Sequence, residues 1–245
     1  MKILPLLRKL QNVTALTDQD VLALDDAVLQ IDDLPARQAI IAEGERPACV
    51  HLILDGWAAR CKFTRRGARQ FTGFLVPGDF CDMHITVLAR MDHAIETLTP
   101  CKVAQLSPPA LDRLTRENSN LSRALWWSTL VDEAVLREWV VNNGQRTAYE
   151  AIAHILCEMH MRLDMVGLVA GDVLSFPLTQ EDLASAAGLT AVHTNRVLQK
   201  LRQRGLIELR ERVLTVLDLP GLEEAAGFDR GYFHLLPRHE AGVER

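Results

Sequence analysis

The spacing of apolar residues changes once along this chain of 245 residues, and that change constrains the fold more than any other feature. Between residues 37 and 107 the apolar residues form short runs that are separated by turn residues. After Pro108-Pro109 they recur at helical spacing. Short runs are typical of antiparallel strands, and strands segregated from helices along a chain are typical of the α+β class.

The first part of the chain predicts a small antiparallel β domain with the architecture of a sandwich, a β-roll or jelly-roll, or a barrel. A short helix precedes it, because Thr17 is a good N-cap and Asp18 and Asp20 complement the positive helix end. Asp55-Gly56 separates two strand-like runs and predicts a hairpin, since that turn requires positive φ. The predicted strand runs are 51–54, 57–63, 70–75, 95–98 and 102–106.

A long helix is predicted next. Asn118 or Ser119 can cap it, and Asn142-Asn143-Gly144 is predicted to end it near Val141, after roughly 36 Å. Its apolar residues cover more than one stripe, so a second face needs a cover. We expect that cover to be a second copy of the chain; the alternative is a helix wholly buried in one monomer. The residues predicted to form the dimer contact are Trp127, Leu130, Val131 and Ala134.

The segment from residue 179 to residue 206 predicts two short helices joined by a tight turn. Thr179 and Thr190 are suited to cap the two helices, Gly188 to form the turn, and Gly205 to end the second helix. A further helix with an apolar face and a hairpin around Gly171-Asp172 precede this segment. Strand-like runs at 206–209 and 213–217 follow it and predict a second hairpin, which makes the whole a winged helix-turn-helix.

Basic residues concentrate in the same segment. The net charge of the chain is −5, but residues 193–212 contain six Lys and Arg against two Glu, which leaves −9 for the remainder. This pattern favours double-stranded DNA as a partner over the alternative, an ordinary helical hairpin with a solvated basic face. Base contacts are assigned to Val192, His193, Asn195 and Arg196, and phosphate contacts to Thr179, Thr190, Lys200, Arg210 and Arg212, with Gln199 on the same exposed face.

The order of these parts resembles the Crp/Fnr superfamily of bacterial transcription regulators. The resemblance is carried by residues 178–201, Gly56-Trp57 and Pro77-Gly78-Asp79-Phe80. It implies a homodimer on a palindromic operator, a hinge at Asn142-Asn143-Gly144, and a cyclic-nucleotide-binding-like sensor domain. RNA polymerase is a further partner that a transcription regulator can have. The implied domains are residues 1–113 for the sensor, 114–143 for the dimerisation helix, 144–218 for the DNA-binding domain and 219–245 for a C-terminal extension.

Two departures from the family pattern argue against familiar effectors. Asp82-Met83 and Met91-Asp92 occupy the positions where cAMP receptors have Gly-Glu and Arg-Ser, so a cyclic phosphate lacks its cationic partner. No cysteine precedes Cys49, which removes the N-terminal cluster of the iron–sulfur branch. We therefore expect a small-molecule effector other than cAMP, and no cofactor. The residues predicted to line its pocket are Asp82, Met83, His84, Arg90 and Asp92.

Other classes of function have weaker support in the sequence. The five cysteines have no CxxC spacing and are expected to be reduced and buried. A cupin-like enzyme would need a His-x-His pair, which is missing, and a docking module with a non-functional DNA domain would not need clustered basic residues. No metal site is expected. The chain has no run of about 18 apolar residues, so we expect a cytoplasmic protein that does not contact the membrane.

Overall fold

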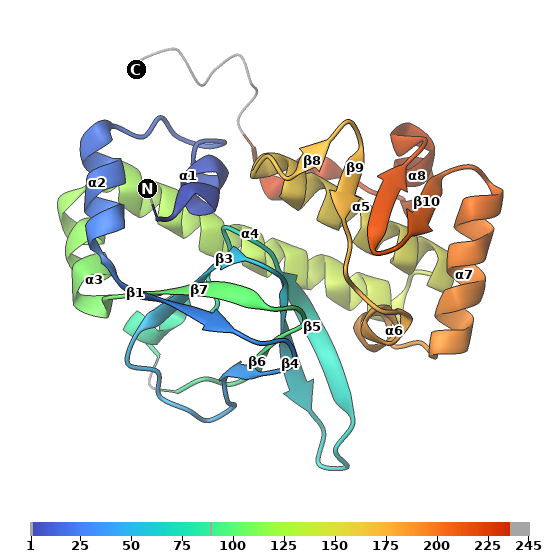
Figure 1. The fold of residues 1–245 in the computed structure, drawn as a ribbon, viewed down its shortest axis with the longest axis horizontal. Coiled ribbons are helices and arrows are strands. Elements are labelled where there is room, and N and C mark those ends of the chain that lie inside the picture. The colour runs from blue at the N-terminus through green and yellow to red at the C-terminus, as the bar shows by residue number, and fades with distance from the viewer. Residues whose placement is uncertain (1, 89, 236–245) are drawn as a thin grey trace. The chain divides into compact units, whose positions relative to one another are not determined.

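The computed structural model describes residues 2–88 and 90–235, except for the side chains of His84 and Thr86 (Figure 1). These residues form two compact units. The first contains residues 2–61, residues 74–133 and the segment from Phe233; the second contains Lys62–Gly73 and Ala134–Tyr232. The long helix α4 (Ser119–Gly144) contributes residues to both units.

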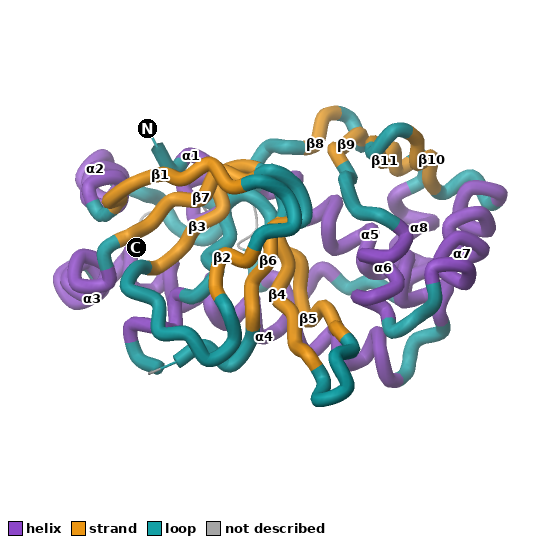
Figure 2. Tube along the Cα trace, turned by 60° about the horizontal axis from the view of Figure 1, so that its bottom comes forward, coloured by secondary structure: helices purple, strands orange, loops and turns teal. Residues whose placement is uncertain are grey.

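The first unit is built on two sheets, as the sequence predicted for the α+β class. One sheet has the order β1-β7-β3 and the other β2-β6-β4-β5 (Figure 2). Strand β7 pairs antiparallel with both of its neighbours. The strands are β1 (Val28–Leu34), β2 (Ala39–Ile41), β3 (Val50–Asp55), β4 (Ala58–Phe63), β5 (Arg69–Leu75), β6 (Ala94–Thr97) and β7 (Cys101–Leu106). Strand β1 was not predicted, and a 3₁₀ turn, η1 (Met83–Thr86), follows β5.

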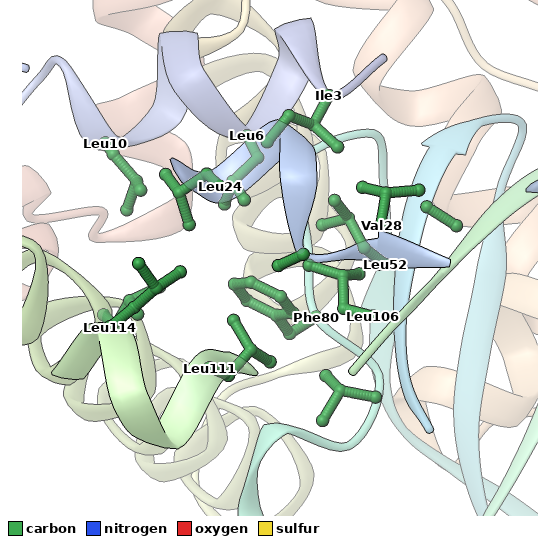
Figure 3. Close-up of a cluster of buried hydrophobic side chains, with 14 of the residues drawn as sticks. Ile3, Leu6, Leu10, Leu24, Val28, Leu52, Phe80, Leu106, Leu111 and Leu114 are labelled. Carbon is green, nitrogen blue, oxygen red and sulfur yellow. The ribbon is translucent and has the colours of Figure 1, made fainter. Parts of the chain in front are cut away.

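The sheet β1-β7-β3 has apolar residues buried on both faces. On one side Ile53 and Val103 pack with Ile41 and Ile95 of the other sheet. The opposite face is covered by helices α1 (Leu4–Leu10), α2 (Asp18–Asp26) and α3 (Pro108–Glu117), whose leucines surround Phe80 (Figure 3). Burial on both faces explains why the strand runs are apolar without strict alternation.

The predicted hairpin at Asp55-Gly56 is wrong. Strand β3 pairs with β7 and β4 pairs with β6, so the turn connects the two sheets instead of two neighbouring strands. Gly56 has φ +83°, and a Cβ there would lie 2.2 Å from the carbonyl oxygen of Pro100. The glycine is required both for its backbone conformation and for this close approach.

Helix α4 is longer than predicted. Asn118 caps it by accepting a hydrogen bond from the amide of Leu121, but the helix continues through Asn142-Asn143-Gly144 instead of ending before them. The Asn143 side chain donates to the carbonyl of Trp139, and Asn142 Oδ1 accepts a hydrogen bond from Arg146. These polar contacts allow asparagines at the helix end, and the turn follows at Gln145-Arg146.

Two of the four residues predicted for the dimer contact do not lie on the exposed face of α4. Val131 and Ala134 are buried within the single chain, at 3% and 5% exposed. Trp127 packs against the first unit's core, and its indole Nε1 donates to the carbonyl of Phe233. Of the four predicted residues only Leu130 is exposed. The exposed apolar stripe of α4 consists of Trp126, Leu130, Leu136, Val140 and Val141.

The second unit contains the predicted winged helix-turn-helix. Helix α5 (Ala148–Met165) is followed by the hairpin of β8 (Val169–Ala170) and β9 (Val173–Ser175). Helices α6 (Gln180–Ala187) and α7 (Ala191–Gln203) come next, and then the hairpin of β10 (Ile207–Arg210) and β11 (Val213–Val216). The four strands form one sheet in the order β10-β11-β9-β8.

The C-terminal extension is folded through residue 233, which the sequence did not predict. Helix α8 (Leu219–Ala226) packs on α5, and a 3₁₀ turn, η2 (Arg230–Phe233), follows. Within the second unit, the His154 ring of α5 lies 5.1 Å from the Phe228 ring and 6.0 Å from the Tyr232 ring. The end of the predicted extension, residues 236–245, lies outside the described residues.

Candidate nucleic-acid interface

The N-termini of α6 and α7 and the turn between them are fixed by the residues that the sequence singled out. The hydroxyl of Thr179 accepts a hydrogen bond from the Asp182 amide, and the Asp182 carboxylate accepts one from the Thr179 amide, which completes a capping box. Gly188, at φ +63°, makes the turn, and Thr190 caps α7 through the amide of His193. These contacts fix the turn and the direction in which α7 leaves it.

One face of α7 is buried and the opposite face is exposed. Val197, Leu198 and Leu201 anchor the helix in the second unit. Five predicted contact residues lie in solvent, namely Val192, His193, Arg196, Gln199 and Lys200. Asn195 differs from them: it is half-buried, and its Nδ2 donates to Oε1 of Gln180 on α6 at 2.9 Å. An adenine contact by Asn195 would have to form beside that hydrogen bond.

A hollow of about 710 Å³ runs along the exposed face of α7. The N-terminal ends of α5 and α7 meet at it, through the capping residues Thr147 and Thr190. A helix N-terminus favours anions through its dipole, and Arg196 and Lys200 add two positive charges to the same surface, which His193 also lines. The hollow is suited to anionic oxygens such as those of a phosphate backbone.

The wing presents basic side chains on a tight turn. Arg210 pairs with Val213 in the strand register, so Glu211 and Arg212 form the two-residue loop, at φ +48° and +63°. Positive φ at both positions is the type I′ geometry, which favours Asn and Gly. Arg212 is exposed and its backbone carbonyl accepts from the Phe176 amide, whereas the side chain of Arg210 pairs with Glu208 at 2.7 Å.

Three residues of this surface were missed in the sequence. Thr147, the N-cap of α5, and Ala148 and Tyr149 in its first turn line the hollow together with α7. The signal for the helix start was available, because Thr147 and Glu150 have the spacing of a capping box, which the structure contains. That the helix start lies beside α7 depends on tertiary packing, which no local pattern encodes.

Four of the five predicted effector residues have described side chains, and these four contact different parts of the chain. Asp82 is fully buried and bound by His51, whereas Arg90 donates to the carbonyl of Gly44 and Asp92 contacts His93 at the surface. Met83 packs against the core beneath the helices, and the side chain of His84 lies outside the described residues. The Asp82 carboxylate is held by His51 within the core, and the effector contact of these residues stays a prediction.

The cysteines are free thiols, and four of the five are buried; Cys49 is partly exposed. Burial raises the pKa of Cys101 to about 11, and that of Cys81 well above the ordinary thiol value. Within residues 2–88 and 90–235, three or more His, Cys, Asp or Glu side chains nowhere gather as metal ligands would. In that same part of the chain, no helix has the length and apolarity needed to cross a membrane.

Comparison with known proteins matches each unit to a domain family. Residues 150–225 match the Crp-like helix-turn-helix domain, and residues 31–118 match the cyclic nucleotide-binding domain. The nitrogen fixation regulation protein FixK of Bradyrhizobium diazoefficiens is 25% identical over 77% of this chain and 78% of its own length. The transcriptional activator protein FnrL of Cereibacter sphaeroides is 26% identical over 89% of this chain and 88% of its own.

A solved structure supports the same fold. The structure of FixK2 from Bradyrhizobium japonicum superposes with a TM-score of 0.73 at 21% identity, and the alignment covers 82% of this chain and 98% of that one. A strand-rich domain of the cyclic nucleotide-binding type joined to a winged helix-turn-helix defines a DNA-binding transcription regulator. The chain belongs to the Crp/Fnr superfamily of bacterial transcription regulators.

Proposed function

We propose that the protein is a homodimer that binds a palindromic operator in double-stranded DNA, with α7 of each subunit in a major groove. The observation that carries this proposal is the hollow along α7, where the N-termini of α5 and α7 lie together with the exposed side chains of Arg196 and Lys200. Such a surface attracts consecutive backbone phosphates while the helix reaches the base edges.

Within this interface, the residues divide between base and backbone contacts. Arg196 is exposed in the middle of α7 and is suited to a bidentate contact with guanine, and Val192 can pack on a thymine methyl group. Thr190, Lys200 and Arg212 serve the phosphates, and Arg210 serves them less directly because it is paired with Glu208. Thr179 contributes mainly as a cap, since its hydroxyl donates a hydrogen bond to the Asp182 carboxylate and accepts one from the Asp182 amide.

The exposed stripe of α4 supplies the dimer contact in this proposal. Trp126 is 64% and Val140 67% exposed, and Leu130 lies on the same side of the helix. An apolar stripe of this kind is costly to leave in water, and the helix of a second copy is the simplest self-complementary cover. The division into sensor, dimerisation helix, DNA-binding domain and extension follows the sequence boundaries 113, 143 and 218.

The effector of the proposed regulator is a small molecule other than cAMP. Asp82 lies in the core at the position of the family's phosphate-binding segment, and a buried carboxylate there would repel a cyclic phosphate. Calorimetric titration with cAMP should give no binding heat, and a micromolar dissociation constant would contradict this reading. We also propose that the protein is cytoplasmic, that RNA polymerase is a partner, and that it has no enzymatic activity.

A selection from randomised DNA duplexes tests the proposal directly. The purified chain is incubated at physiological salt and the retained duplexes are sequenced. We expect a two-fold palindrome whose half-site centres are about one helical turn, or 34 Å, apart. Enrichment only after cell extract is added would indicate an effector-dependent regulator. No enrichment in either case would refute DNA recognition and favour a ligand-binding or docking module.

A further inference from the structure

Tyr149 lies against two basic side chains, those of Lys200 on α7 and of Arg204 at the C-cap of α7. The Nζ of Lys200 is 4.8 Å from the centroid of the Tyr149 ring, and the Cζ of Arg204 is 5.1 Å from it. The Arg204 guanidinium also donates a hydrogen bond to the Tyr149 hydroxyl at 3.4 Å. One aromatic ring thus contacts two cations that lie four residues apart on the same face of a helix.

The ring is held by a rigid support. Tyr149 is the second residue of α5 and lies between the two members of its capping box, Thr147 and Glu150. The Glu150 carboxylate accepts hydrogen bonds from the Thr147 amide and hydroxyl at 2.7 and 2.8 Å. The residues that follow, Ala151 and Ile152, are buried in the second unit. A tyrosine also has few rotatable bonds, so its ring offers a fixed surface.

The two cations need such a surface. Lys200 and Arg204 are exposed, and long basic side chains lose much rotamer freedom when they are ordered on a phosphate. They also repel each other at this helical spacing. The negative face of an aromatic ring attracts both, which offsets the repulsion and restricts the positions of their charged groups before DNA arrives.

We propose that Tyr149 is a positioning residue of the DNA interface, which holds Lys200 and Arg204 beside the hollow for contact with neighbouring phosphates. This inference rests on the proposed function, because it assumes that α7 meets DNA. It extends the interface to a residue on α5 that need not touch a base, and it makes Arg204 a phosphate contact.

The test is a double-mutant cycle with the full chain and its selected duplex. Tyr149→Leu should weaken binding about fivefold on operator and random duplexes alike, since phosphate contacts carry no sequence information. Tyr149→Phe retains the ring and should stay within about twofold of the unsubstituted chain. When Lys200→Ala and Arg204→Ala are already present, adding Tyr149→Leu should change affinity by less than about 1.5-fold.

Several outcomes would overturn this role. An equal loss from Tyr149→Leu with and without the two basic residues would mean that the ring acts through the stability of α5. Unchanged affinity, or tighter binding, would mean that the ring does not prepare the cations for DNA. Tyr149→Met replaces the leucine variant if that variant does not fold, as judged by thermal unfolding. If the unsubstituted chain binds no duplex, the proposed function fails and this role with it; if it binds and Tyr149→Leu binds equally, only the role of Tyr149 fails.

Discussion

His51 holds both oxygens of the Asp82 carboxylate. The backbone amide of His51 donates to Oδ1 at 2.6 Å, and its ring Nδ1 lies 2.8 Å from Oδ2. His51 is on β3, and Asp82 lies three residues after the Pro77-Gly78-Asp79 turn. The pair therefore fixes the segment that follows this turn to the sheet. A carboxylate that is fully buried is stable only with such partners.

Replacing Asp82 should therefore lower stability. We expect Asp82→Ala to reduce the free energy of unfolding by about 1–3 kcal/mol, because the His51 amide loses its acceptor inside the core. Urea unfolding measures the change. Asp92→Ala is the matched control, since the Asp92 side chain is exposed and its contact with His93 is at the surface. Similar losses in both variants would contradict a special role for the buried pair.

Alanine substitutions of Arg196 and Lys200 should weaken DNA binding in different ways. Arg196→Ala should cost about 1–3 kcal/mol of binding free energy and relax discrimination at one base pair in each half-site. Lys200→Ala should weaken binding to all duplexes and reduce the slope of log affinity against log salt by about one. Binding titrations at several salt concentrations on operator and scrambled duplexes separate the two, and a sequence-selective loss from Lys200→Ala would contradict its assignment to phosphate.

The oligomeric state should depend on Leu130. Leu130→Asp puts a charge into the exposed stripe of α4 and should convert dimers into monomers on size-exclusion chromatography. Leu22→Asp, at an exposed leucine of α2, is the matched control and should leave the dimer intact. Val131→Asp should unfold the chain, because it buries an unpaired charge. A dimeric Leu130→Asp variant would assign the contact to another surface.

Stability should fall in mild acid because of His154. Burial, assisted by the positive charge of Arg146, lowers the pKa of His154 to about 3, and the nearby Glu138 carboxylate is already shared with Arg146 at 2.7 Å. The unfolded chain takes up this proton near pH 6.5, whereas the folded chain does not. The contribution of neutral His154 to the free energy of unfolding is therefore complete above about pH 6.5 and falls by about 1.4 kcal/mol per pH unit below it.

Unfolding of His154→Gln at pH 7.5 and pH 5 measures that contribution. The variant should lose about 2 kcal/mol less than the unsubstituted chain between these two values, since all other titrating groups are shared. Equal pH dependence of the two chains would mean that folding does not lower the pKa of His154.

Local signals predicted the second unit well. Thr179 and Thr190 cap their helices through the amide three residues later, and Gly188 makes the turn by its own backbone conformation. The sequence alone therefore locates both helices and the turn. The Gly171-Asp172 hairpin was predicted for the same reason, and both residues have positive φ. What such signals cannot supply is the partner across space, which is why Tyr149 beside Lys200 was not foreseen.

The errors have a common cause in tertiary context. Asp55-Gly56 carries a hairpin signal, but the close approach of Pro100 makes it a turn between sheets. The apolar arc of α4 was interpreted as two faces that both need a cover; the chain covers one of them and leaves the other exposed, and periodicity could not say which is which. Val131 belongs to the inner face and Leu130 to the outer one, although they are neighbours in sequence.

The folded C-terminal extension sets the boundary of any fragment that could be expressed by itself. A fragment ending after the last wing strand would appear complete by its secondary structure. It would nevertheless strip Leu222, Phe228 and Tyr232 from α5 and expose the surface around His154 and Cys157 to water. Apolar surface uncovered in this way promotes aggregation, so a fragment intended for DNA-binding work needs to retain the chain through Tyr232.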